Sequence, residues 1–163
     1  MPTLFVIGRI LLVSIFAISG VNKLLDLNGT AQAIASQVTI PETVAGILAQ
    51  IESVTGIAGP KLLAIGSIIL ELGGALLIAL NFGTRLGAVM LIAFTAAATL
   101  YFHDFWNMTG AERALNLANA QKNLAIIGGL LMLFALGSWR PFSIGRVEYI
   151  PPPREERYPH PAE

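Results

Sequence analysis

Four stretches of mostly apolar residues dominate the chain, and each is about as long as a lipid bilayer is thick. A membrane-spanning helix needs roughly 20 mostly apolar residues in succession. We therefore predict four membrane-spanning helices, at Leu4–Asn22, Pro60–Leu80, Thr84–His103 and Lys122–Ser138. A cleaved signal peptide is the alternative for the first stretch. Against it, Arg9 lies inside the apolar run, whereas a signal peptide carries its positive charge ahead of that run.

The segment between the first two predicted spans contains another helical pattern. In the stretch ETVAGILAQIESV the apolar residues recur at the spacing of one helix face, namely Val44, Ile47, Leu48, Ile51 and Val54. Pro41 fits the first position of such a helix, and Glu42 suits its positive end. We expect an outer helix that lies on the membrane or caps the bundle. It contains no Lys or Arg, so attraction to anionic lipids would not hold it there.

Two segments close to the last span complete the predicted architecture. The stretch LYFHDFW contains the aromatic residues Tyr101, Phe102, Phe105 and Trp106. Such a group is typical of a membrane–water boundary, and ligand stacking is the alternative interpretation. Residues 146–163 are proline-rich and charged, which predicts an extended, disordered tail. The expected fold is an all-α membrane protein, with a four-transmembrane-helix bundle and an outer amphipathic helix in residues 1–145, followed by a cytoplasmic tail.

Composition supports a membrane protein and removes several kinds of chemistry. The 163 residues are 55% hydrophobic and 12% charged, whereas about a quarter of the residues in a soluble domain are charged. The net charge is zero, and no Lys/Arg cluster predicts a nucleic-acid partner. The chain has no cysteine, and its two histidines are His103 and His160. Disulfide relays, Cys-ligated clusters and haem held by two helix histidines are therefore excluded, and no metal-ligand cluster is predicted. A redox role would need a diffusible cofactor or a partner subunit.

The basic residues between the spans predict the orientation. Four spans place both termini on one side, whose basic residues are Arg85, Arg140, Arg146, Arg154 and Arg157. The basic residues of the other side are Lys23, Lys61, Arg113 and Lys122. Cytoplasmic segments carry an excess of Lys and Arg, so the side with five is predicted to be cytoplasmic.

Small residues in the predicted spans indicate where helices approach closely. Gly83 and Gly87 form a small-xxx-small pair, and glycine pairs occur at Gly73–Gly74 and Gly128–Gly129. Such residues allow helix backbones to pack against each other within a membrane. We interpret them as packing positions.

Two ionisable residues, Arg9 and Glu71, lie inside predicted spans. Counted from Pro60, Glu71 lies roughly 16 Å deep, and counted from Lys23, Arg9 lies roughly 21 Å deep. The difference of about 5 Å is within reach of an arginine side chain. An isolated charge at mid-bilayer costs about 2.5–3.5 kcal/mol, so we predict that Arg9 and Glu71 form an ion pair. The pair is either structural or part of a functional site.

A second polar group is expected at the outer ends of the predicted helices. Lys23, His103 with Asp104, and Lys122 all lie at such ends. Around one opening, with Glu71 beneath, they would suit a quinone-like or anionic head group, with Tyr101 or Trp106 against a ring. The simpler alternative is that each lysine only extends its charge to the membrane edge.

Several of these stretches resemble the DoxX family of small four-helix inner-membrane proteins. The opening GRILLVSIFAISGVNKLLD has an arginine in the first span and a G-x-x-K at its end, as in that family. ELGGALLIALNFGTRLGAVML is similar to its second and third spans, and HDFW, KNLAIIGGLLML and GSWRPFSI fit the remainder. The resemblance implies a bacterial inner-membrane protein and, through similarity to the membrane subunit of thiosulfate:quinone oxidoreductase, a redox association. With no cysteine to hold a sulfur intermediate, self-contained sulfur oxidation is in doubt.

Three functional hypotheses follow. The first is a membrane subunit or adaptor of a redox or stress-related complex that binds quinone or a small anion through Lys23, His103 and Lys122. The second is a small proton-coupled transporter in which Glu71 carries the proton. The third is a scaffold without a ligand. The sequence does not give a catalytic residue, an oligomeric state or a partner other than the bilayer.

Overall fold

The computed structural model describes residues 2–137, and this part of the chain is all helical, as predicted. Its helices are α1 (Pro2–Leu25), α2 (Leu27–Gln37), α3 (Glu42–Thr55), α4 (Gly59–Ile68), the π-helical turn η1 (Ile69–Gly73), α5 (Gly74–Ala79), α6 (Thr84–Phe102), the 3-10 turn η2 (Phe105–Asn107) and α7 (Gly110–Leu136). The predicted tail at residues 146–163 lies outside the described residues.

Four helical segments of the described chain are long and apolar enough to cross a membrane, which confirms the predicted fold class. They are Thr3–Leu25, Gly59–Ala79, Thr84–Asn107 and Gly110–Leu136. The last begins well before the predicted Lys122, because GAERALNLANAQ is rich in helix-forming residues although it is too polar to read as membrane-spanning. The helix is therefore longer than its apolar part.

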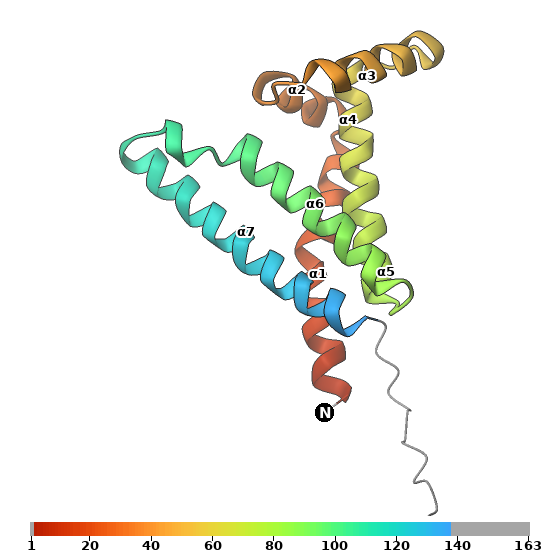
Figure 1. Cartoon of the computed structure of the whole chain (residues 1–163), viewed down its shortest axis with the longest axis vertical. Coiled ribbons are helices and arrows are strands. Elements are labelled where there is room, and N and C mark those ends of the chain that lie inside the picture. Colours follow the sequence, from red (N-terminus) through yellow and green to blue (C-terminus); the bar gives the residue numbers. More distant parts are fainter. Residues whose placement is uncertain (1, 138–163) are drawn as a thin grey trace, which may run out of the picture.

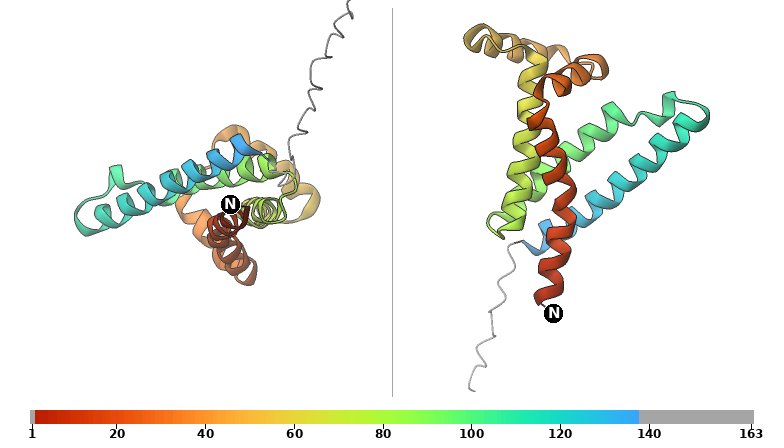
Figure 2. Two further views of the ribbon diagram at one scale, coloured as in Figure 1. Left: turned by 90° about the horizontal axis from the view of Figure 1, so that it is seen from below. Right: turned by 180° about the vertical axis from the view of Figure 1, so that it is seen from behind.

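The four spans form two antiparallel pairs. In Figure 1, α1 runs beside the continuous rod made by α4, η1 and α5, and α6 runs beside α7. Both figures show the α6/α7 hairpin inclined to the first pair, close to it at α5 and diverging toward the end that carries α2 and α3 (Figures 1 and 2). We call that end of the molecule the outer end, and the end with the α5–α6 turn the inner end.

Glycines hold the two pairs together near the inner end. A Cβ added at Gly87 would lie 2.7 Å from the carbonyl oxygen of Gly74, so the backbones of α5 and α6 are in direct contact. The surrounding core is built from α1, α5, α6 and α7 and contains Val13, Phe16, Ala75, Ile78, Ala88, Leu91, Leu130 and Leu133. The predicted packing role of these glycines is confirmed for Gly74 and Gly87.

Two short helices, α2 and α3, cross the outer end of the α1/α4 pair (Figure 1). The helix α2 was not predicted. It begins after Asp26, whose side chain accepts a hydrogen bond of 2.9 Å from the Gly29 amide. The helix α3 confirms the predicted amphipathic segment, although Pro41 precedes its first residue rather than occupying it. A carboxylate oxygen of Glu52 accepts a 3.1 Å hydrogen bond from the Gly59 amide, which joins α3 to the start of α4.

Candidate functional site

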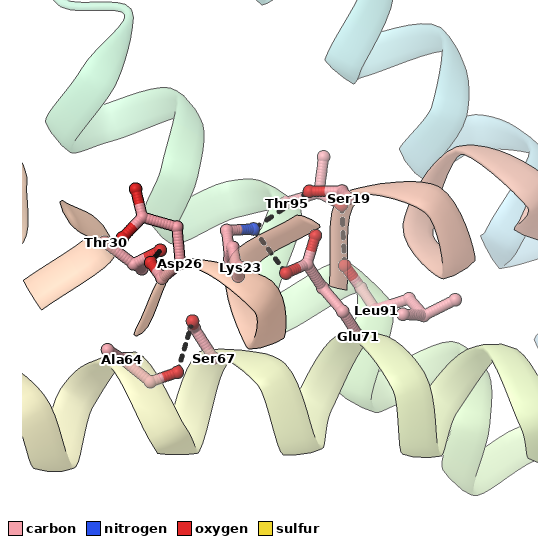
Figure 3. Close-up of polar contacts among 9 residues, drawn as sticks. All are labelled: Ser19, Lys23, Asp26, Thr30, Ala64, Ser67, Glu71, Leu91 and Thr95. Atoms are coloured by element: carbon pink, nitrogen blue, oxygen red, sulfur yellow. Dashed lines mark hydrogen bonds and ion pairs between the residues drawn. The ribbon is translucent and has the colours of Figure 1, made fainter. Parts of the chain in front are cut away.

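An ion pair between Lys23 and Glu71 lies inside the bundle (Figure 3). Lys23 Nζ donates to Glu71 Oε2 and, over 2.9 Å, to Ser19 Oγ one helical turn earlier. The same ammonium lies 4.4 Å from the centre of the Phe94 ring. An acid, a hydroxyl and an aromatic face thus surround the lysine charge, which is how a partly buried ammonium is compensated.

The predicted pair between Arg9 and Glu71 is wrong, because the structure gives Glu71 a different partner. Arg9 is buried, but its guanidinium lies 5.8 Å from the centre of the Phe5 ring, and its Nε has no hydrogen-bond partner among residues 2–137. The depth estimate had placed Lys23 level with Pro60. In the structure Gly20 of α1 packs against Glu71 and Leu72, so Lys23, one turn further out, lies deeper along the rod of α4 and η1 than Pro60 does.

Gly20 explains how α1 comes so close to the acid. A Cβ at this position would lie 2.7 Å from the Leu72 side chain and 3.4 Å from Glu71 Cβ. Because glycine has no such atom, the α1 backbone packs directly on η1, and Lys23 follows one turn later. Glu71 itself is in a π-helical turn, a local widening of the helix that is frequent at functional sites.

A cavity of about 940 Å³ opens above this ion pair. Side chains of α1, α4, η1, α6 and α7 form its walls, and residues of α2, including the buried Ile34, line its outer side. Most of the lining is apolar. Of the residues predicted to bind a ligand, the structure brings Lys23, Tyr101, His103 and Lys122 to this cavity.

Trp106 does not line the cavity. Its side chain is 52% exposed, and its ring packs edge-on against Phe105 with 5.1 Å between the ring centres. This position agrees with the anchoring interpretation of the aromatic group rather than with ligand stacking. The aromatic side chain beside the ion pair is instead Phe94, held by a perpendicular contact with Phe16 at 6.3 Å. A lone phenylalanine in an apolar span gave no signal of this role.

The polar groups at the outer part of the cavity already have partners. His103 Nδ1 lies 3.0 Å from Asn116 Oδ1, and Lys122 Nζ donates to Asn119 Oδ1 over 3.1 Å. Asn123, which follows Lys122 at the outer end expected from the sequence, donates to Thr99 Oγ1 over 3.0 Å and so joins α7 to α6. These side chains can present hydrogen-bonding groups at fixed positions, with the lysine charge nearest to solvent.

Comparison with known proteins identifies the family. Residues 4–104 match the family model DoxX. The chain belongs to the DoxX family. The inner membrane protein YphA of Escherichia coli strain K12 is 35% identical to this DoxX chain over 136 residues, which are 83% of the chain and 84% of YphA. No solved structure matches the chain. The resemblance seen in the sequence is thereby confirmed, and it assigns the protein to a family of membrane proteins.

Proposed function

We propose that this DoxX protein binds an uncharged, membrane-soluble ligand of the quinone class in the cavity between its two helix pairs, and that it acts as a subunit or adaptor of a redox complex. The observation that supports this proposal most is a cavity of about 940 Å³ with mostly apolar walls and one ion pair at its base. Ligand sites of this size are mostly apolar with a few placed polar groups.

The charge balance at the base of the cavity favours a neutral ligand over a small anion. The charge of Lys23 is compensated by Glu71, and Ser19 and Phe94 surround the ammonium further. An anion placed there would compete with a carboxylate that is almost completely buried. A quinone has no charge, and its carbonyl oxygen can accept a hydrogen bond from an ammonium or a histidine N–H.

The polar end of such a ligand has two sets of contacts available. At the base, the Lys23 side chain is 24% exposed and borders the cavity. At the outer part, Tyr101, His103 and Lys122 border it. The apolar tail would extend along the aliphatic side chains of α4 and α6 toward the bilayer. Because the chain has no cysteine, electrons would pass between the ligand and a partner subunit, with this chain as the membrane-embedded holder.

The proposal includes a cellular location. The name of the relative YphA places that protein in an inner membrane, and we extend this location to the present chain. With five basic residues on the side of the termini and four on the other, both termini would lie in the cytoplasm.

A cavity-filling variant tests the proposal. Gly66 lines the cavity, and a Cβ added there would meet no atom within 4 Å. Gly66→Phe would therefore fill the cavity from α4 without disturbing the backbone. Gly128→Phe is the matched control, because Gly128 is also helical and open but does not line the cavity.

The measurement is binding of a short-chain ubiquinone analogue to the protein in lipid nanodiscs. We expect saturable binding by the native chain and by Gly128→Phe, and at least a tenfold loss of affinity, about 1.4 kcal/mol, in Gly66→Phe. Equal binding by all three proteins would reject the cavity as the site. No saturable binding by the native chain would reject the quinone class and favour the scaffold hypothesis.

One observation supports proton-coupled transport as a second candidate. Glu71 Oε1 is buried and has no hydrogen-bond partner in the described part of the chain, and an acid inside a membrane span is a common site of proton relay. In this alternative, Glu71 would take up and release a proton beside Lys23. Proton flux into proteoliposomes that is abolished in Glu71→Gln would support it, and flux that is unchanged in that variant would reject it.

A further inference from the structure

The apolar stripe of α3, formed by Val44, Ile47, Ile51 and Val54, has no partner in the described chain. These side chains are 38–86% exposed, whereas the neighbouring Leu48 is buried. In a surface helix of 14 residues, such an exposed apolar stripe is stabilised when something apolar covers it. The cavity is lined by residues of α2 and by no residue of α3, so closing the cavity does not account for the stripe.

The contacts of α3 with α4 determine which way the stripe faces. Leu48 is the residue of α3 that packs on the start of α4, where its Cβ lies 3.7 Å from the position of an added Gly59 Cβ. Glu52 joins the same two elements through the Gly59 amide. Directly from this point α4 enters its membrane-spanning segment, Gly59–Ala79.

Val44 and Ile51 lie one turn to either side of Leu48 on the same helix face. Figure 1 shows α3 lying across the end of α4 rather than along it. The face of α3 that contacts the start of α4 therefore also faces the space around α4. In the membrane this space is occupied by lipid. The opposite face carries Glu42, Ala49 and Ser53 and turns away from it.

We propose that α3 lies in the membrane–water interface, with its apolar stripe inserted among the lipid head groups and upper acyl chains. The occupant of the stripe is lipid, because the stripe is continuous with the entry point of a membrane span and carries no charge. The absence of Lys and Arg from α3 means that its binding depends on apolar burial and not on anionic lipids. Interfacial helices of this kind insert their apolar face to about 5–10 Å.

Because the native chain has no cysteine, single nitroxide labels can be placed without background. The test compares Ile51→Cys on the stripe with Ser53→Cys on the opposite face, each spin-labelled in the full chain and reconstituted into uncharged phosphatidylcholine nanodiscs. Collisions with oxygen, which concentrates in lipid, are compared with collisions with a water-soluble nickel chelate. We expect oxygen to dominate at position 51 and the nickel chelate to dominate at position 53, with a label at position 51 about 5–10 Å below the phosphates.

Each other result overturns the proposal. Nickel-dominated collisions at both positions would mean that the stripe faces water. Spin–spin broadening at position 51 that disappears on dilution with unlabelled protein would mean that a second copy covers the stripe. Low accessibility to both reagents without broadening would mean that α3 folds back on the bundle. Helical circular dichroism equal to that of the native chain shows that each variant is folded.

Discussion

Replacing Lys23 by methionine should destabilise the bundle more than replacing Glu71 by glutamine, although both changes break the same ion pair. The Glu71 side chain is 1% exposed, and none of the described residues forms a hydrogen bond to its Oε1. Lys23→Met therefore leaves a buried carboxylate with no compensating charge, which costs about 3–5 kcal/mol. The lost contact with the Phe94 ring adds about 0.5–2 kcal/mol.

Glu71→Gln should destabilise the bundle less than Lys23→Met, because the Lys23 charge that remains has other contacts. The Lys23 ammonium keeps Ser19 Oγ and the Phe94 ring, and its 24% exposure gives it access to the cavity. The glutamine carbonyl still accepts a hydrogen bond, so the loss is about 1–2 kcal/mol. The double variant Lys23→Met/Glu71→Gln contains neither charge and should be more stable than Lys23→Met alone, with a coupling energy of about 1–3 kcal/mol.

The assay is reversible unfolding in mixed micelles with an increasing fraction of dodecyl sulfate, followed by tryptophan fluorescence. Lys122→Met is the control, since Lys122 is an exposed lysine whose hydrogen bond within the described residues is to Asn119 of its own helix. This change should alter stability by less than about 0.5 kcal/mol. The reasoning is refuted if Glu71→Gln is the more destabilising single change, or if the effects of the two single changes add up in the double variant.

Three further changes test the packing that positions the site. Gly20→Val should destabilise by about 1–3 kcal/mol in the same unfolding assay, because its Cβ would lie 2.7 Å from a leucine side chain of η1, whereas Gly8→Val has open space and should not. Gly87→Ala should lower stability by a similar amount through its contact with a carbonyl oxygen of α5, and Gly128→Ala, which is open, should be neutral or stabilising. Glu52→Ala should cost about 1 kcal/mol and speed hydrogen exchange in the first turn of α4, because the Gly59 amide loses its acceptor, and unchanged exchange there would contradict this contact.

Hydropathy was sufficient for the four spans because a bilayer fixes both the length and the composition of a helix that crosses it. It was insufficient wherever the helix is polar. The first turns of α7 combine good helix formers with charged residues, so the apolar count began only at Lys122. The helix α2 contains Gly29 and Thr30 and buries only Ile34 along its length, and so it shows no apolar stripe. Asp26 was the one available signal, as a preferred residue to begin a helix.

The candidate site was predicted in part, for reasons that depend on long-range packing. The residues Lys23, Tyr101, His103 and Lys122 do reach one cavity, since residues at the same end of adjacent helices must meet. That they bind a ligand stays a prediction. The prediction that Arg9 pairs with Glu71 was wrong, because counting residues from the helix ends assumes that all spans begin at the same depth. The position of α1 along the rod of α4 and η1 goes with close packing of Gly20 against the Leu72 and Glu71 side chains, which hydropathy does not reveal.

The two bases of α1 show why a count of charges could not assign the pair. An ammonium is a compact, strongly hydrated charge, so its burial requires partners on several sides, and Lys23 has a carboxylate, a hydroxyl and a ring. A guanidinium is delocalised, weakly hydrated and stacks on aromatic faces, and Arg9 lies against the ring of Phe5 instead of an acid. Lys23, which is strongly hydrated in water, thus has polar partners, and Arg9, which is weakly hydrated, lies against an aromatic ring. It follows that the polar base of the cavity depends on a lysine at this particular position, whereas within residues 2–137 the surroundings of Arg9 are aromatic rather than acidic.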